Sequence, residues 1–505
     1  MRQIPLAIPP GVQANGTEYQ NKPHWVRSNL VRWREGAIKP VGGWQALATE
    51  GDIENVCRSL FGWRDNSGFR YLALGTTDAL LAYDDTGTLS DVTPEGLASG
   101  RADAVRGNGY GYGPYGAEAY GTARTPAPGT EAQARVTLPT SWSFDNFGQV
   151  LVAISLADRR LVSWQPPPAT TAPDPAVFVE NAPPGFAVLV TEERHVVVLG
   201  ADGDPVQVAW ASRETLDEWS PLPTNTAGSF RLQTVGTLRT ALRARGEVLL
   251  LTTQDAHTMN FVGSPFVYGF EQVGSACGII SPKAGVAVRD FAVWMGEGSW
   301  FVYDGVVRPL TSSVQDYVFR DINPVQKGKA FAALNTEHDE VWWFYPSTES
   351  EEIDRYVIWN YTENHWAVGS LERTAWTNEA VYPNPTAVSA EGTLYAQEIG
   401  WTADGDPLLD QRFLESAPLE IDNGDRLAVV TQMIPDELNR GQVQARFSLR
   451  NSPNGPETEK GPFPMSDYVD LRFTARQVQI RLEGAEDEDW RIGTNRLRAT
   501  EGARR

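Results

Sequence analysis

The sequence predicts an all-β protein: a β-propeller core with an inserted Gly/Tyr-rich loop and a C-terminal β-sandwich-like domain. The chain of 505 residues holds 46 Gly, 34 Pro and 17 Trp, a composition typical of a chain that turns often and packs flat side chains between turns. Apolar runs end at Gly, Pro, Asn or Asp before a third helical turn could close. Asp-Gly or Asn-Gly pairs separate several of these runs, as hairpin turns do.

The propeller is predicted from a repeated unit of strand, turn and strand. Six segments share this unit: 69–83, 150–164, 186–210, 247–261, 291–303 and 340–359. Four-stranded antiparallel units that recur at roughly 40 to 50 residues form the blades of a propeller. A pair of β-sandwiches is the competing layout. The propeller is favoured because the units share a shape and their tryptophans fall at strand ends, where blades stack.

Three further segments complete the predicted organisation around the propeller of 51–410. Residues 1–50 form an N-terminal arm that is a candidate for completing the propeller. Residues 99–135 cannot pack a core of their own, because they hold a run of Gly and Tyr at 107–116 followed by prolines, so we expect a long excursion from the propeller. The repeated strand-turn-strand unit does not continue into residues 411–505. Four short strands, at 427–432, 443–449, 469–473 and 477–482, predict a small β-sandwich there.

The net charge of the chain argues against a nucleic-acid-binding protein. Lys and Arg total 43 against 64 Asp and Glu, which gives a formal charge of −21 and a pI near 4.8. A protein that binds phosphates through bulk charge needs a basic surface. Basic residues crowd the two ends of the chain, where we expect either contacts with acidic surfaces of neighbouring subunits or ordinary solvated charge. They are Arg27, Arg32, Arg34 and Lys39, and Arg472, Arg476, Arg481, Arg491, Arg496, Arg498, Arg504 and Arg505.

No catalytic or cofactor motif stands in a suitable context. Gly111-x-Gly113-x-x-Gly116 matches the dinucleotide fingerprint in its letters, but neither the strand nor the helix that it needs flanks it. The sequence holds no nucleophile elbow, zinc-protease motif or phosphate-binding loop. The five histidines lie far apart and are predicted at turns or on the surface: His24, His195, His257, His338 and His365. The chain is therefore predicted to be no enzyme and to bind no cofactor or metal.

Two acidic features leave alternatives open. A pair of carboxylates about 5 to 10 Å apart would be enough for glycoside hydrolysis, and sequence alone does not locate such a pair. The acidic segments 202–205, 404–407 and 486–489 offer oxygen ligands for Ca²⁺, but they lack the spaced ligand loop of a calcium site. Tight turns and a solvated acidic face are the favoured interpretation.

The cysteines and the apolar segments indicate whether the chain forms disulfides, crosses a membrane or is secreted. Cys57 and Cys277 are the two cysteines of the chain, so a disulfide framework is not expected and two reduced thiols are predicted. No apolar stretch reaches the roughly 18 residues that span a bilayer. The N-terminus lacks the apolar segment of a signal peptide, so we expect neither a membrane span nor a secretion signal.

A succession of short motifs runs along the chain. In the N-terminal arm the motifs are Ile8-Pro-Pro-Gly-Val12, Asn15-Gly-Thr17, Trp25-Val-Arg27, Val31-Arg-Trp33-Arg34-Glu-Gly36 and Lys39-Pro-Val-Gly-Gly-Trp44. Further along they are 71–75, 83–84, 91–94, the Gly/Tyr-rich run 107–116, 142–148, 210–213, 219–221, 300–305, 473–478 and 489–493. The motifs are colinear and span nearly the whole chain, and their succession is more specific than any one of them. This succession resembles the bacteriophage tail nozzle proteins, also called packaged-DNA stabilisation or tail tubular proteins.

The resemblance implies a virion structural protein that forms a ring, typically six-fold, at the distal end of a phage tail. Such a ring continues the channel of the portal and adaptor proteins, retains the packaged genome and lets it pass at ejection. The expected partners are copies of this chain, adaptor or other tail proteins, tail fibres and the host surface, with genome DNA sliding through without sequence-specific binding. The expected location is the virion, after synthesis in the host cytoplasm. An acidic wall suits a conduit, because it repels phosphate at short range.

The inserted loop supplies the predicted contact residues. We expect Tyr110, Tyr112, Tyr115 and Tyr120 to make inter-subunit or lumen contacts. Related propellers also occur as tail-hub parts of long-tailed phages, so the tail type stays open. The alternative function is a glycan-binding or glycan-cleaving propeller for host-surface recognition. Convergent carboxylates beside an exposed tryptophan would favour that alternative, whereas a ring with a wide acidic lumen would favour the conduit.

Overall fold

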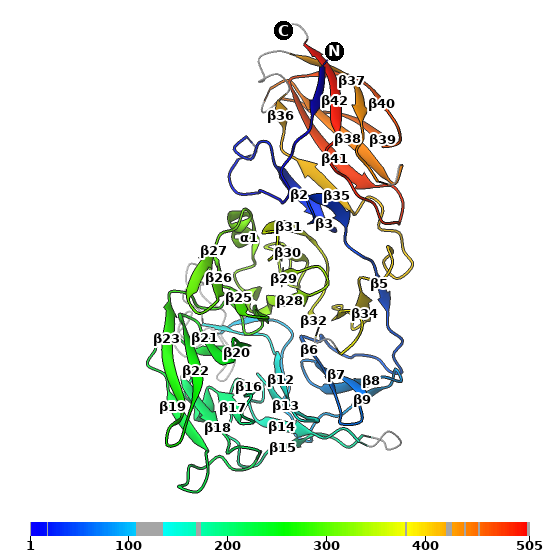
Figure 1. Cartoon of the computed structure of the whole chain (residues 1–505). Helices are drawn as coiled ribbons and strands as arrows, with labels where there is room; N and C mark the ends of the chain where they lie inside the picture. The colour runs from blue at the N-terminus through cyan, green and yellow to red at the C-terminus, as the bar shows by residue number, and fades with distance from the viewer. Residues whose placement is uncertain are drawn as a thin grey trace, which may run out of the picture.

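The computed structural model describes residues 2–17, 19–107, 135–167, 173–378, 381–420, 427–438, 441–452 and 455–501. These residues build two β-rich bodies, a ring of sheets and a smaller β-domain that meets the rim of the ring (Figure 1). Among them, the one α-helix, α1 (Gln315–Asp321), is far too short to cross a lipid bilayer. Two 3₁₀ turns, η2 (Ala201–Gly203) and η3 (Gln326–Lys329), accompany it.

The ring consists of seven four-stranded antiparallel sheets in the described part of the chain. Blade 1 is β6 (Ser59–Arg64), β7 (Arg70–Gly75), β8 (Leu80–Asp84) and β9 (Leu89–Asp91). Blade 2 is β12 (Trp142–Phe147), β13 (Val150–Ser155), β14 (Leu161–Trp164) and β15 (Val177–Phe178). Blade 3 is β16 (Ala187–Val190), β17 (Val196–Leu199), β18 (Gln207–Trp210) and β19 (Gly228–Arg231).

The remaining blades follow the same order from the channel outward. Blade 4 is β20 (Leu238–Ala244), β21 (Glu247–Thr252), β22 (Asp255–Gly263) and β23 (Val267–Ser275). Blade 5 is β24 (Gly285–Val288), β25 (Phe291–Met295), β26 (Trp300–Tyr303) and β27 (Val307–Leu310). Blade 6 is β28 (Phe331–Asn335), β29 (Glu340–Tyr345), β30 (Arg355–Asn360) and β31 (His365–Ser370). Radially arranged four-stranded sheets confirm the predicted propeller.

Blade 7 closes the ring with a strand from the other end of the chain. It consists of β32 (Ala375–Thr377), β33 (Thr386–Val388), β34 (Leu394–Gln397) and β5 (Trp44–Ala46). β5 pairs antiparallel with β34, with Trp44 opposite Gln397 and Ala46 opposite Tyr395. Because the first blade follows β5 and the last blade receives it, this pairing joins the beginning of the propeller to its end.

Tryptophans connect neighbouring blades through their indole N–H groups. Trp142 of blade 2 donates to the carbonyl oxygen of Thr76 at 2.7 Å, and an added Cβ on Gly75 would lie 2.3 Å from its ring. Trp343 of blade 6 donates to Ala284 at 3.1 Å, and Trp376 of blade 7 donates to Leu334 of blade 6 at 3.1 Å. Each indole thus fills the space between two blades and satisfies a backbone carbonyl there.

The β-domain is a two-sheet sandwich that both ends of the chain build. One sheet has the order β1 (Arg2–Pro5), β42 (Arg496–Glu501), β37 (Ala428–Ile434) and β40 (Val469–Ala475). The other has β2 (Trp25–Asn29), β35 (Phe413–Ser416), β41 (Gln477–Gly484), β38 (Val443–Arg450) and β39 (Thr458–Pro464), with β36 (Leu419–Glu420) beside β41. Phe447 and Phe473, one from each sheet, pack with ring centroids 5.4 Å apart. The four strands predicted in this region correspond to β37, β38, β40 and β41.

Two short hairpins complete the structure. β3 (Val31–Arg34) pairs with β4 (Ala37–Pro40) where the β-domain meets the propeller. β10 (Val105–Gly107) pairs with β11 (Arg135–Thr137), so the described residues on either side of 108–134 come together.

A buried ionic cluster fixes the β3–β4 hairpin to the propeller. The Arg32 guanidinium contacts Glu398, which follows β34 of blade 7, and its Nε lies 3.1 Å from Glu340 Oε1 on β29 of blade 6. These three side chains are at most 6% exposed. Asn335 and the Gly42 backbone N–H also donate to Glu398, at 2.8 and 2.9 Å.

Arg32 was predicted to be solvated or to contact a neighbouring subunit. That prediction is wrong, because two carboxylates of its own chain compensate its charge.

Burial alone would raise the pKa of Glu398, but Arg32 and then His338 hold it far below its ordinary value. Burial would lower the pKa of Arg32, and the two carboxylates raise it instead. Both groups therefore stay charged in the interior. A compensated charge cluster of this kind ties three chain segments together, and it depends on all of its members being present.

Because of Glu437 in the β-domain, the stability of the folded protein is expected to depend on pH. Burial raises the pKa of this carboxyl to about 7, although it accepts a hydrogen bond from Gly441 N–H at 3.3 Å. The folded state thus holds a proton that the unfolded chain has already lost. Stability is retained at low pH and is lost as the pH rises from the ordinary glutamate value toward 7.

We therefore expect Glu437→Gln to raise the melting temperature at pH 8 and to change it little at pH 5. Thermal melts at the two pH values measure this difference. The exposed Glu459→Gln in β39 is the control, and it should give the same change at both pH values. A Glu437→Gln variant that is destabilised at pH 8, or shifted equally at both pH values, would contradict the assignment.

Candidate functional site

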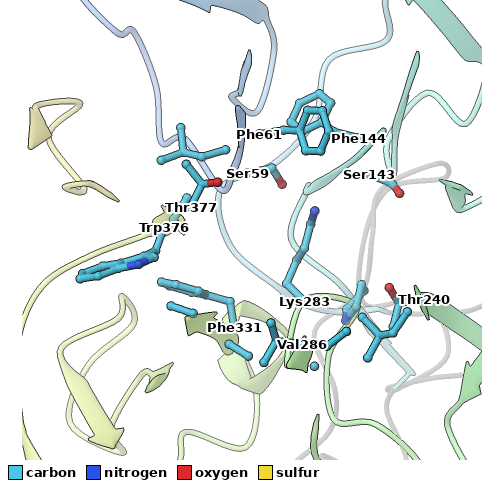
Figure 2. Close-up of a pocket in the computed structure, with 18 of the residues that line it drawn as sticks. Ser59, Phe61, Ser143, Phe144, Thr240, Lys283, Val286, Phe331, Trp376 and Thr377 are labelled. Carbon is cyan, nitrogen blue, oxygen red and sulfur yellow. The ribbon is translucent and has the colours of Figure 1, made fainter. Parts of the chain in front are cut away.

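The inner strands of the seven blades surround a central channel with a cavity volume of about 400 Å³. Each inner strand contributes to the wall, and Figure 2 shows these side chains around the cavity. The larger apolar side chains of the lining include Phe61, Phe144, Val286, Phe331 and Trp376. The hydroxyls of Ser59, Ser143, Thr240 and Thr377 lie among them, and polar atoms make up more of the exposed wall than apolar atoms do.

Charged groups in the channel wall are few. Arg243 of β20 contacts the Asp145 carboxylate and donates through Nε to the Val190 carbonyl oxygen at 2.9 Å. The Val190 N–H donates to the same carboxylate at 2.7 Å, so this network ties blades 2, 3 and 4 together. Lys283 extends into the channel toward Phe144 in Figure 2, and its Nζ lies 5.9 Å from that ring centroid.

The described residues of this wall include no pair of carboxylates. Asp145 is the one carboxylate among the described residues that line the channel, and Arg243 neutralises it. Glycoside hydrolysis needs two carboxyl groups with different protonation states. Its volume of about 400 Å³ is that of a small-molecule pocket, which does not accommodate double-stranded DNA. A DNA conduit would have to form between copies of this chain.

An ionic cluster anchors the inserted segment at one end of the channel. Arg58, just before β6, donates to both Glu352 carboxylate oxygens, at 3.0 and 2.6 Å, and to the Ala102 carbonyl oxygen. Lys329 Nζ, whose side chain is fully buried, donates to Asp103 at 2.6 Å and to Glu352 at 3.2 Å. Burial alone would raise the pKa of Glu352, but Arg58 and Lys329 hold it below its ordinary value.

These contacts fix the described root of the insertion, 99–107 and 135–140, beside the start of the inner strands. Gln326 adds two hydrogen bonds to Ala104, accepting from its N–H at 2.8 Å and donating to its carbonyl at 3.2 Å. The predicted contact residues Tyr110, Tyr112, Tyr115 and Tyr120 lie outside the described residues. Sequence reasoning placed the insertion but did not identify Arg58, Lys329 and Glu352, whose separation along the chain hides their contact.

The histidines do not converge on a site. His195 and His257 are buried, which corrects the prediction of turn or surface histidines for these two. His195 Nδ1 lies 2.8 Å from the Tyr268 hydroxyl. His257 Nε2 lies 3.3 Å from Asp255 Oδ1 but forms no hydrogen bond among the described residues. The described residues contain no cluster of three metal-ligating side chains.

Both cysteines are buried free thiols, and burial raises the pKa of Cys57 to about 12.

A second concave surface lies on the β-domain, with a volume of about 440 Å³. Its lining is strongly charged and consists of Arg27, Asp410, Glu415, Arg446, Ser448, Arg450, Glu457, Glu459, Gln479, Arg481 and Glu483. Carboxylates gather here, but arginines pair with them: Arg446 Nε lies 2.5 Å and Arg481 Nε 2.9 Å from Glu483. This lining includes no tryptophan, so the described groove lacks the aromatic platform that would favour glycan binding.

Comparison with protein families and with curated proteins finds no match for this chain. Solved structures match it at low identity. A streptogramin B lyase has 7% identity and a TM-score of 0.37, covering 68% of this chain and 95% of its own. YCF48 bound to a D1 peptide has 9% identity and a TM-score of 0.37, covering 72% and 99%. The Pan2 WD40 domain of Neurospora crassa has 9% identity and a TM-score of 0.36, covering 70% and 94%. No function is transferred from these proteins to this chain.

Proposed function

We propose that this chain is a virion structural protein, a subunit of the nozzle or hub ring at the distal end of a phage tail. In this role it retains packaged DNA and forms part of the channel for ejection, and it is not an enzyme. The observation that carries the proposal is the position of the N-terminal motifs that resemble tail nozzle proteins. They fold into β2, the β3–β4 hairpin and the start of β5, the segments that join the β-domain to the propeller.

A protein that bears the pressure of packaged DNA needs its parts to be rigidly joined. The N-terminal arm supplies three such joints: β2 pairs with β35 in the β-domain, Arg32 binds blades 6 and 7, and β5 closes the ring. The same motifs that carry the resemblance therefore supply the mechanical connections. This correspondence supports the proposed structural role.

The charge of the chain supports passage of DNA without adhesion. A net charge of −21 per copy, multiplied around a ring, favours an acidic lumen, and an acidic surface repels phosphates at short range. Since the channel of one propeller is too small for a duplex, the lumen of the proposed conduit lies between copies. Closed rings of identical chains use heterologous interfaces, in which two different surfaces of the chain meet.

Two binding assays separate this function from glycan recognition. A fluorescent 30-base-pair duplex in about 50 mM salt, where phosphate contacts are strongest, should show no increase in anisotropy with the purified protein. A glycan array should show no saturable binding. Duplex binding at this salt would contradict a non-adhesive conduit. Selective glycan binding would favour the host-recognition alternative.

A further inference from the structure

Arg373, between β31 and β32, is a buried cation whose charge is only partly compensated. The residue is 4% exposed, and its Nη1 donates to the Glu372 backbone carbonyl at 2.8 Å. Its Nε and Nη2 are buried and have no hydrogen-bond partner among the described residues. Those two atoms form the side of the guanidinium that binds a carboxylate or phosphate through two parallel hydrogen bonds.

The other buried arginines differ from Arg373 in having a carboxylate of their own chain close to the guanidinium, although Nε and Nη2 of Arg412 also have no hydrogen-bond partner among the described residues. Arg32 and Arg58 contact carboxylates of their own chain, and Arg412 has Asp487 3.5 Å from its Nη1. No carboxylate of the described residues forms an ion pair with Arg373. Aromatic rings flank it instead, with the guanidinium carbon 4.9 Å from the Trp44 ring centroid and 4.4 Å from that of Tyr395. Burial lowers its pKa to about 10, so the side chain stays charged at neutral pH.

Arg373 also forms part of the wall of a groove of about 490 Å³. The groove lies between blades 6 and 7 and the segment that leads to the β-domain, and Trp44, Arg355 and Gln411 also line it. Two carboxylates, Asp354 and Glu372, belong to the same lining, and Arg355 Nε lies 3.6 Å from Asp354 Oδ2. Trp44 is partly exposed, so its indole covers the guanidinium and also faces the groove. The chain thus places an aromatic-flanked guanidinium just below the surface of a cavity that can admit a ligand.

We propose that Arg373 is the anchor of an oxyanion-binding site in this groove, which accepts a carboxylate or a phosphate through Nε and Nη2. Because both atoms are buried and the Trp44 ring lies over the guanidinium, access for an anion requires this indole to move. A buried guanidinium without a charge partner reduces stability, and a bound oxyanion restores the missing hydrogen bonds. The site is independent of the proposed tail function. The anion can come from a free small acid, from phosphate or from an acidic side chain of another polypeptide.

Isothermal titration calorimetry and thermal melts test the site at constant ionic strength with glutarate, inorganic phosphate and an octaglutamate peptide. Wild-type protein should bind at least one probe saturably and melt at a higher temperature in its presence. Binding of glutarate or phosphate identifies a small-anion site, and binding of the peptide alone identifies a site for acidic polypeptide segments. Arg373→Met and Arg373→Lys should both weaken binding at least tenfold, because lysine keeps the charge but lacks the two-pronged geometry.

The variants also separate a binding role from a structural one. Arg373→Met preserves the packing between the rings and removes an uncompensated charge, so its melting temperature without anion should equal or exceed that of the wild type. The control Arg320→Gln changes an exposed arginine of α1 and should bind the probes as the wild type does. Equal probe binding by wild type and Arg373→Met would overturn the proposal, as would the absence of binding to all three probes.

Discussion

Replacing Arg32 by alanine is expected to lower the free energy of unfolding by about 3 to 5 kcal/mol, because it leaves two buried carboxylates without their cation. Glu340 and Glu398 are 1% and 6% exposed, so water does not take the place of the guanidinium. The loss should affect the propeller and the β-domain together, since the cluster joins the β3–β4 hairpin to blades 6 and 7.

Denaturant unfolding followed by tryptophan fluorescence measures this effect. Arg27→Ala is the matched control from the same arm, because Arg27 is 66% exposed and lies 3.7 Å from Glu415. An exposed pair of this kind contributes at most about 1 kcal/mol. If Arg32→Ala and Arg27→Ala have equal effects, the buried cluster does not hold the two bodies together.

Gly278→Ala is expected to destabilise the protein by about 3 kcal/mol or more, because it forces a side chain into occupied backbone space. Gly278 lies between blades 4 and 5, where an added Cβ would stand 2.0 Å from Thr253 O and 2.2 Å from Thr253 C. The residues before and after Gly278 are hydrogen-bonded to the segment that contains Thr253. Cys277 N–H donates to Gln254 O at 3.0 Å, and Ile279 N–H donates to Thr252 O at 3.0 Å. The segment therefore cannot move away without breaking these bonds.

The comparison for this variant is Gly298→Ala in blade 5, where an added Cβ would have no atom within 4 Å. That substitution should change the free energy of unfolding by no more than about 0.5 kcal/mol. Thermal melts and denaturant curves of the two variants give the difference directly. A Gly278→Ala protein as stable as Gly298→Ala would show that the contact between blades 4 and 5 adapts to the added methyl group.

Local sequence signals predicted the blades and the sandwich strands, whereas for closure of the propeller they offered the N-terminal arm of residues 1–50 as a candidate and did not identify the pairing of β5 with β34. The six repeated strand-turn-strand segments all lie within blades, because hairpin pairing is local and its apolar pattern is visible in a short window. The pairing of β5 with β34 joins residues about 350 positions apart. A three-residue strand carries too little pattern to specify so distant a partner. The positions of β1 and β2 in the C-terminal sandwich were missed for the same reason.

The candidate sites were harder to predict than the fold. Arg32, Arg58 and Arg373 look alike in the sequence, yet the structure compensates the first two with carboxylates and leaves two nitrogen atoms of the third without partners. Burial decides these roles, and sequence does not show which arginine of a polar segment is buried. The sequence also did not show which strand of each blade lines the channel, because the neighbouring strands of a blade are apolar as well.

The measurement that tests the central claim most directly is the mass and symmetry of the purified protein, by light scattering and by class averages of negatively stained particles. The account predicts a closed ring of identical chains, six-fold in symmetry, with a central opening wide enough for duplex DNA. A monomer that persists at high protein concentration and in the presence of tail adaptor complexes would contradict it.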